Sequence, residues 1–168
     1  GSNQHGKLGD GSEEDRLSPV PVEELGKVAS IDAGGGQTCA VLEDGTLSCW
    51  GMFTWYQTTE IDSKPSPVPV PIPGLGAVVE VRAGYGHSCA LRADGTALCW
   101  GDNGSGEIGD GTTASHRVWP VAVKGLTGAV ALALGGSHSC ALLADSRVRC
   151  WGENSSGQIG DGTAEDRH

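Results

Sequence analysis

The chain has few cationic residues and no long apolar run. Only 11 of its 168 residues are Lys or Arg, against 21 Asp and Glu, which gives a net charge of −10. A protein that binds a phosphate backbone needs clustered Lys and Arg, so this balance argues against nucleic-acid binding. No apolar run approaches the roughly 18 residues that a membrane-crossing helix needs, so membrane insertion is not expected either.

The composition also argues against helices. Charged residues make up 19% of the chain and there is one Phe and one Met, whereas there are 28 Gly and 8 Pro. This composition favours short strands joined by tight turns. No signal peptide is visible, but Gly1-Ser2 resembles the remnant of a cleaved tag, so the missing leader says little about secretion.

The sequence repeats itself about every fifty residues. Trp50, Trp100 and Trp151 each close a copy of one motif, and they are 50 and 51 positions apart. We divide the chain into a tag remnant (1–2), three repeats (3–51, 52–101 and 102–152) and the start of a fourth (153–168). The three aligned motifs are TCAVLEDGTLSCWG, SCALRADGTALCWG and SCALLADSRVRCWG.

Each repeat offers about four short strands. A segment of period two precedes each motif, with apolar residues such as Val79 and Val81 alternating with polar ones such as Glu80 and Arg82. This alternation is typical of a strand. A Pro-Val segment is expected at a sheet edge, because proline cannot donate a ladder hydrogen bond. A Gly-rich linker completes the repeat, as in GEIGDGT and GQIGDGT.

Each cysteine pair lies in a predicted hairpin. Residues 43–45 fit a three-residue loop that ends in a left-handed glycine. In that register the paired cysteines face each other at a non-hydrogen-bonded site, where Cα atoms approach to about 4.5 Å, within disulfide range. Ser146 replaces the turn glycine in the third repeat, so that turn should be less stable. The predicted bridges are Cys39–Cys49, Cys89–Cys99 and Cys140–Cys150.

Two other cysteine chemistries fit poorly. Zinc ligands usually come in pairs two to four residues apart, whereas here ten positions separate each pair. Redox catalysis lacks its Cys-x-x-Cys signature. We therefore expect no metal and no cofactor. Disulfides form in oxidising compartments, which favours a secreted, cell-surface or periplasmic location.

These motifs together resemble the regulator of chromosome condensation repeat, in the cysteine-paired version that is similar to secreted bacterial proteins. The resemblance rests on Ala33-Gly34, Asp44-Gly45 and Trp50-Gly51 and on their counterparts, and it covers 3–163. It implies an all-β fold, a β-propeller of four-stranded blades, and protein binding more than catalysis. Relatives include a nucleotide-exchange factor for a small GTPase and a secreted β-lactamase inhibitor, so both kinds of binder are alternative functions.

Three blades are too few for a ring, because propellers have about four to eight. The missing blades would come from further sequence or from other chains; two chains would give six. The N-terminal NQHGKLGDGSEEDR resembles the C-terminal ENSSGQIGDGTAEDRH. The chain therefore begins and ends in the same phase of the repeat, as head-to-tail assembly requires. We expect a homo-oligomer.

Several catalytic or ligand motifs have simpler structural interpretations. The Gly-x-Gly-x-x-Gly match at 104–109 is followed by a loop, not by the helix that a dinucleotide site needs. Asp102, Gly104 and Gly106 fall at positions one, three and five of a possible calcium loop, but only Asp102 has a carboxylate. The repeated Asp10, Asp110 and Asp161 are expected to hold turns. His87 and Ser88 are neighbours on a strand and point to opposite faces, so they do not form a nucleophile–base pair. We expect no enzyme activity.

One segment departs from the repeat. Met52-Phe53-Thr54-Trp55-Tyr56 stands where the other copies have a Gly-rich linker. Divergent loops of repeat arrays often carry binding residues, and aromatic residues are enriched at interface hot spots. Phe53, Trp55 and Tyr56 are therefore the candidate partner-binding residues. The predicted function is a non-catalytic module for protein–protein interaction or self-assembly, as part of a larger propeller.

Overall fold

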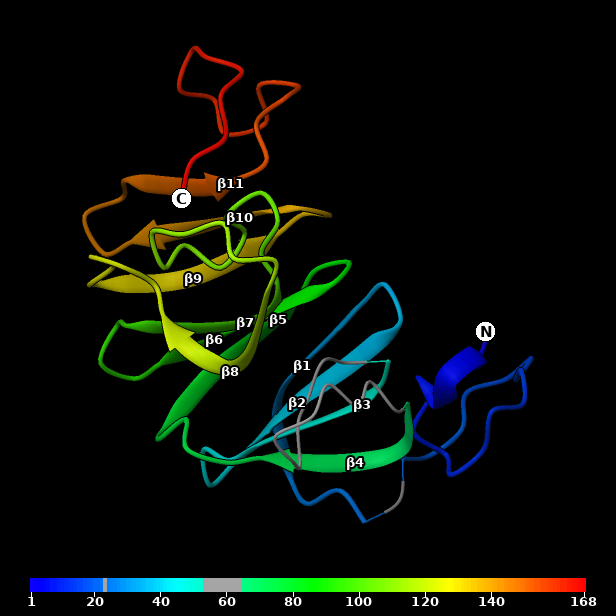
Figure 1. The fold of residues 1–168 in the computed structure, drawn as a ribbon. Helices are drawn as coiled ribbons and strands as arrows, with labels where there is room; N and C mark the ends of the chain where they lie inside the picture. Colours follow the sequence, from blue (N-terminus) through cyan, green and yellow to red (C-terminus); the bar gives the residue numbers. More distant parts are fainter. Residues whose placement is uncertain (23, 53–64) are drawn as a thin grey trace.

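The chain is all-β. The computed structural model describes residues 1–22, 24–52 and 65–168, and among these the one helix is a short 3-10 turn, η1 (Gln4–Gly6). Eleven strands form three antiparallel sheets that follow one another along the chain (Figure 1). The all-β prediction is confirmed.

Each sheet is a meander in which consecutive strands pair. The first sheet has the order β1-β2-β3-β4 and the second β5-β6-β7-β8, whereas the third has three strands, β9-β10-β11. We call them blades 1, 2 and 3. Their strands are β1 (Val28–Gly34), β2 (Gln37–Leu42), β3 (Leu47–Gly51) and β4 (Ser66–Ile72); β5 (Val78–Ala83), β6 (His87–Arg92), β7 (Ala97–Asp102) and β8 (His116–Ala122); β9 (Ala129–Leu134), β10 (His138–Leu143) and β11 (Val148–Gly152).

The blades are offset by one strand from the sequence repeats. The Pro-Val segment that opens the second repeat forms β4, which pairs with β3 of blade 1. It is the outermost strand, as expected for a segment with Pro67, Pro69 and Pro71. The cysteine hairpin therefore supplies the second and third strands of each blade.

The cysteine hairpins have the predicted register. Cys39 is opposite Cys49, with Cα atoms 4.1 Å apart, and all three expected bridges are present. Gly45 and Gly95 occupy the turns with φ of 81° and 77°. Ser146 adopts the same left-handed conformation at φ 67°, where a side chain is disfavoured.

The hydrophobic core lies between neighbouring blades, in two clusters. One cluster joins blades 1 and 2 through residues such as Val41, Ile72 and Trp100. The other joins blades 2 and 3 through Leu126, Leu132, Trp151 and their neighbours. Trp100 and Trp151 are thus packing residues between blades.

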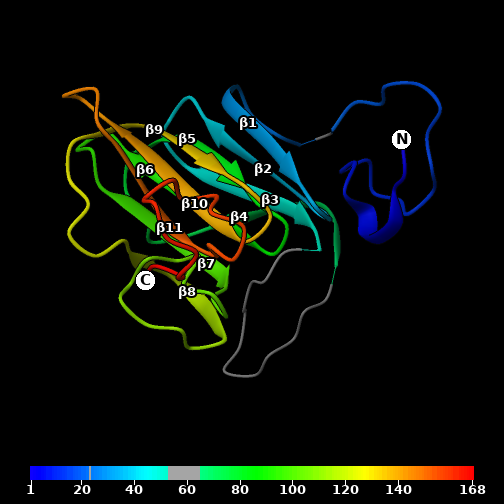
Figure 2. The same cartoon turned by 90° about the horizontal axis from the view of Figure 1, so that it is seen from above.

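Polar side chains also join the inner strands. The carboxylate of Asp32 accepts a hydrogen bond from the N–H of Ala83, at 2.9 Å. Glu80 accepts one from the N–H of Leu132 in the same way, at 2.8 Å. Figure 2 shows the innermost strands β1, β5 and β9 side by side. The polar residues of the predicted alternation therefore bind one blade to the next.

Candidate protein-binding face

The long connections among the described residues leave the blades at one end. In an antiparallel meander, the turn after the first strand and the loop after the third strand lie at the same end of the sheet. This end carries the turns at 35–36 and 85–86 and the loops 103–115 and 153–165. We call it the loop face. The opposite end carries the tight cysteine-hairpin turns.

Three loops each contain the same pattern of internal hydrogen bonds. The side chain of Asn103 is buried, and its oxygen accepts a hydrogen bond from the N–H of Ile108. Asp110 accepts hydrogen bonds from the N–H of Thr112 and from the guanidinium of Arg117. The same roles belong to Asn3, Asp10, Ser12 and Arg16 and to Asn154, Asp161, Thr163 and Arg167. The repeated aspartates therefore hold turns.

The network lowers the pKa of these aspartates. The guanidinium of Arg16, followed by the hydroxyl of Ser12, lowers the pKa of Asp10 to about 2. The hydroxyl and N–H of Thr163, together with Arg167, lower the pKa of Asp161 to about 2. Both carboxylates are therefore ionised at neutral pH, and they accept hydrogen bonds from residues of their own loop.

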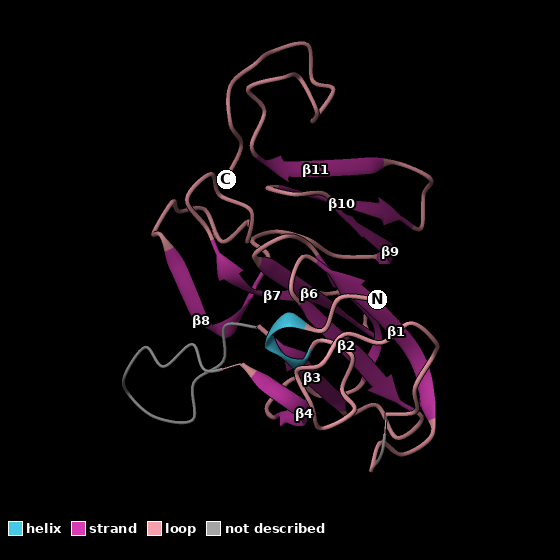
Figure 3. Ribbon diagram, turned by 90° about the vertical axis from the view of Figure 1, so that its right-hand side faces the viewer, coloured by secondary structure: helices cyan, strands magenta, loops and turns pink. Residues whose placement is uncertain are grey.

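The loops at 3–16 and 103–115 each pack on a tryptophan of the blade that follows them. The Nε1 of Trp151 donates to the carbonyl of Glu107, at 2.8 Å. Glycine is required where the backbone meets the indole, because a Cβ on Gly9 or Gly109 would lie 2.6 Å from Nε1 of Trp50 or Trp151. Figure 3 shows the N-terminal loop with its 3-10 turn beside β3 and β4. The loops thus stiffen the joints between blades.

A cleft of about 460 Å³ opens on the loop face. Two large side chains at its rim are exposed: Tyr85 keeps 79% of its accessible surface and Met52 keeps 45%. Met52 is fixed by a hydrogen bond from its N–H to the carbonyl of Gly36. His116 and Asp102 form a contact of 2.8 Å in the same cleft. Exposed apolar side chains on a fixed backbone are suited to contact with a protein.

The aromatic segment predicted to bind a partner is only partly visible. Met52 lies in the cleft, whereas Phe53, Trp55 and Tyr56 lie outside the described residues. Sequence reasoning missed Tyr85, which is more exposed than Met52 at this rim. Its signal was present: Tyr85 interrupts a turn that has Gly35 in the first repeat and Gly136 in the third.

His87 is buried and connects blade 2 to blade 3. Its Nε2 lies 2.9 Å from the hydroxyl of Ser139 in blade 3, and that hydroxyl donates to the carbonyl of Glu107. His87 must therefore be the donor to Ser139, which is the reverse of the role of a general base. Burial, and then the nearby His138, lowers the pKa of His87 to about 4. The imidazole is neutral at pH 7.

No group of three or more His, Cys, Asp or Glu side chains in 1–22, 24–52 and 65–168 is arranged to hold a metal ion. Within the same ranges, no helix has the length and hydrophobicity of a membrane span.

Three meander sheets packed side by side, with their loops gathered at one end, define a β-propeller repeat protein. The family model described as "Regulator of chromosome condensation (RCC1) repeat" matches residues 1–41 and 94–142, which is more than half of the chain. A second model of the same description matches 78–107 and 129–158. The chain belongs to this repeat family, and the predicted resemblance is confirmed.

Known relatives are longer than this chain. The human E3 ubiquitin-protein ligase HERC2 is 36% identical over 97% of the chain, which spans 4% of that protein. The ultraviolet-B receptor UVR8 of Arabidopsis thaliana is 29% identical over 99% of the chain, which spans 39% of that protein.

Solved structures of this shape have the same fold. Human WBSCR16 has a TM-score of 0.84 at 24% identity, with 99% of this chain and 45% of that chain covered. Prp20p from Saccharomyces cerevisiae has a TM-score of 0.84 at 22% identity, with 99% and 43% covered. The three blades thus correspond to less than half of a solved propeller.

Proposed function

We propose that this chain is a non-catalytic propeller module that binds another protein through its loop face. The observation that carries the proposal is the pair of exposed side chains, Tyr85 and Met52, at the rim of a cleft on a scaffold pinned by disulfides. Binding residues are often found on loops that a rigid scaffold positions, and tyrosine is enriched among hot-spot residues.

Charge limits the class of partner. The net charge of −10 favours a protein surface that is neutral or basic over an acidic one. Prp20p binds Gsp1p and histones, which supports a binding role for modules of this shape. The three disulfides favour an oxidising location, so we propose a partner that is secreted, on the cell surface or periplasmic.

The test compares variants on and off the loop face. Tyr85→Ala removes the most exposed aromatic of the rim, and Val68→Ala is the matched control, because Val68 is 48% exposed on the outer strand β4. A partner is first isolated with the wild-type chain by cross-linking, and its Kd is then measured with purified variants.

We expect Tyr85→Ala to weaken binding by about tenfold or more, the loss of a hot-spot contact, and Val68→Ala to leave the Kd unchanged. Trp55→Ala, in the adjoining aromatic segment, should cost more than about 1 kcal/mol of binding free energy. Equal affinities for wild type, Tyr85→Ala and Trp55→Ala would refute the proposal.

A further inference from the structure

Every asparagine of the chain closes a loop. There are three, Asn3, Asn103 and Asn154, and all are fully buried, at 0% exposure. In each, the side-chain oxygen accepts a hydrogen bond from the N–H five positions later. The side-chain nitrogen, Nδ2, donates to the carbonyl nine positions later. The amide thus joins the beginning of each loop to its end.

Two of these asparagines stand in a sequence that directs a covalent modification. Residues 103–105 read Asn-Gly-Ser and 154–156 read Asn-Ser-Ser, whereas 3–5 read Asn-Gln-His. Asn-x-Ser, where x is not proline, is the acceptor sequence for N-glycosylation, and it normally marks a surface loop of a secreted protein. The three disulfides also favour an oxidising compartment. The sequence by itself therefore favours a glycan on each of these two loops.

The modification reacts at the atom that the loop uses. The side-chain nitrogen attacks the anomeric carbon of an oligosaccharide that is carried on a lipid pyrophosphate. A C–N bond forms and the C–O bond to the pyrophosphate breaks, so that the lipid pyrophosphate leaves with the electron pair. A base takes one proton from the nitrogen. The acceptor asparagine must therefore expose Nδ2 and give up one of its two N–H groups.

In the folded loops Nδ2 is engaged. That of Asn103 donates to the carbonyl of Thr112, at 3.2 Å. That of Asn154 donates to the carbonyls of Thr163 and Glu165, at 3.1 and 3.0 Å, which occupies both of its N–H groups. Because both asparagines are fully buried, a saccharide on Nδ2 has no space until the loop opens.

The acceptor sequences are also folded into tight turns. The carbonyl of Asn103 accepts a hydrogen bond from the N–H of Gly106, three positions later, at 3.2 Å. The carbonyl of Asn154 accepts one from Gly157 in the same way, at 2.8 Å. The serine of each acceptor sequence lies inside this β-turn, a position that small polar residues favour. The structure of the loop thus accounts for both the asparagine and the serine.

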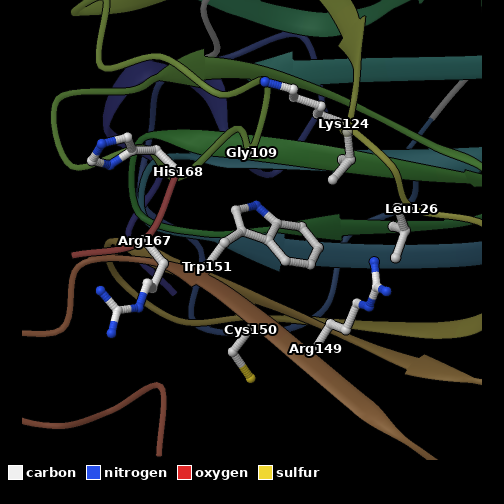
Figure 4. A pocket seen from close by; sticks show the side chains of 9 residues that line it. Gly109, Lys124, Leu126, Arg149, Cys150, Trp151, Arg167 and His168 are labelled. Atoms are coloured by element: carbon white, nitrogen blue, oxygen red, sulfur yellow. The ribbon is translucent and has the colours of Figure 1, made fainter. Parts of the chain in front are cut away.

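Opening the loop at 103–115 also disturbs the contact between blades 2 and 3. Figure 4 shows Gly109 of this loop next to the indole of Trp151. The carbonyl of Glu107 accepts hydrogen bonds from Nε1 of Trp151, at 2.8 Å, and from the hydroxyl of Ser139, at 2.9 Å. His87 bonds the same hydroxyl. A glycan on Asn103 therefore affects more than its own loop.

We propose that Asn103 and Asn154 are N-glycosylation acceptors only while their loops are unfolded, and that a glycan on either asparagine excludes the folded loop. Folding closes both sites, because it buries Nδ2 and uses its N–H groups. Glycosylation before folding diverts the chain from its native structure, because the modified amide cannot return to the loop interior. Neither step requires a partner at the loop face.

The main experiment offers the full chain to a purified oligosaccharyltransferase and a lipid-linked oligosaccharide. The chain is used in its native, disulfide-bonded form and in its reduced, unfolded form, and peptide mass spectrometry locates the products. We expect modification of Asn103 and Asn154 in the unfolded chain and at least about tenfold less in the native chain, because the loops must first open. Equal modification of the two forms, or an unmodified unfolded chain, would overturn the proposal.

A matched control places an exposed acceptor in the same loop. Thr113 is exposed, and Thr113→Asn makes residues 113–115 read Asn-Ala-Ser. Position 113 should be modified in the native chain while Asn103 of the same molecule is not. Ser105→Ala and Ser156→Ala remove the two acceptor sequences and keep both asparagines. Each should abolish modification of its own asparagine in the unfolded chain.

A second measurement tests whether a glycan excludes the folded loop. One chain, Ser156→Ala, is glycosylated at Asn103 while unfolded and is then refolded with oxidation. Its control combines Thr113→Asn with Ser105→Ala and Ser156→Ala, so that the glycan is at 113. Hydrogen exchange of the indole N–H of Trp151, followed by NMR, should be at least about tenfold faster in the first chain, because the loop no longer covers it. Equal exchange in the two chains would overturn the proposal.

Discussion

The loops at 3–16 and 153–167 have the same internal bonds and different surroundings. Asn3 binds the N–H of Leu8, and Asn154 binds the N–H of Ile159, both at 2.9 Å. Only the first loop packs on an indole, that of Trp50. The comparison teaches that the sequence of the loop fixes its conformation locally, whereas its contribution to stability depends on the blade beside it.

The largest difference in unfolding free energy should come from adding one methyl group to each of the two loops. Gly9→Ala forces a side chain into a left-handed backbone at φ 75° and a Cβ to 2.6 Å from Trp50 Nε1. We expect this to lower the unfolding free energy by about 4 kcal/mol, from backbone strain plus overpacking. Gly160→Ala has the same backbone strain, at φ 76°, and no clash. It should cost about 1 kcal/mol.

Chemical denaturation measures both values. Equal costs for Gly9→Ala and Gly160→Ala in the single chain would break the comparison, because the surroundings would then not matter.

The next effect compares the two joints between blades. Gln37 donates to the carbonyl of His87 at the first joint, and His87 bonds Ser139 at the second. The pKa of His87 is about 4 in the folded chain against 6.5 ordinarily. Between these values the unfolded chain binds a proton that the folded chain does not. The unfolding free energy should therefore decrease as the pH is lowered from 6.5 to 4, by up to about 3 kcal/mol.

His87→Gln gives the second joint the side chain of the first. Its unfolding free energy, measured by denaturation at pH 7, 5.5 and 4, should depend on pH less steeply than that of the wild type. Asp10 and Asp161 lose their stabilising contribution as the pH falls from 3.8, their ordinary value, toward about 2, and this contribution is common to the wild type and His87→Gln. Identical pH profiles for both proteins would contradict the role of His87.

The third effect compares buried and less buried bridges. Cys39 and Cys49 are fully buried, whereas Cys140 and Cys150 are partly exposed. Replacing Cys140 and Cys150 by Ala should lower the unfolding free energy by about 2 kcal/mol, because it removes a cross-link that closes a short loop. The same change at Cys39 and Cys49 should cost about 1 kcal/mol more, because it also leaves a cavity. Thermal denaturation with matched controls tests this order.

The smallest effect compares the hairpin turns. Ser146 has φ 67°, where Gly45 and Gly95 stand in the other two blades. Ser146→Gly should raise the unfolding free energy by up to about 1 kcal/mol, because it relieves the left-handed strain. The reverse change, Gly95→Ser, should lower it by a similar amount. A destabilised Ser146→Gly would show that the turn is not strained.

Much of the fold was predictable because it is local and repeated. Period-two alternation indicated the inner strands, and the three-residue turn fixed the cysteine register through Gly45. The aspartates of the loops were also recognisable as turn residues. The cleft was less accessible to sequence reasoning: Tyr85 lies on one blade and Met52 on another, so only packing of the blades brings them to one rim.

The sequence by itself determined the repeat, the strands, the cysteine pairing and the conformation of the loops, because each depends on residues a few positions apart. Only the tertiary structure decided which blade each Pro-Val strand joins and which side chains are exposed on the loop face. These depend on contacts between residues about fifty positions apart, such as Asp32 with Ala83.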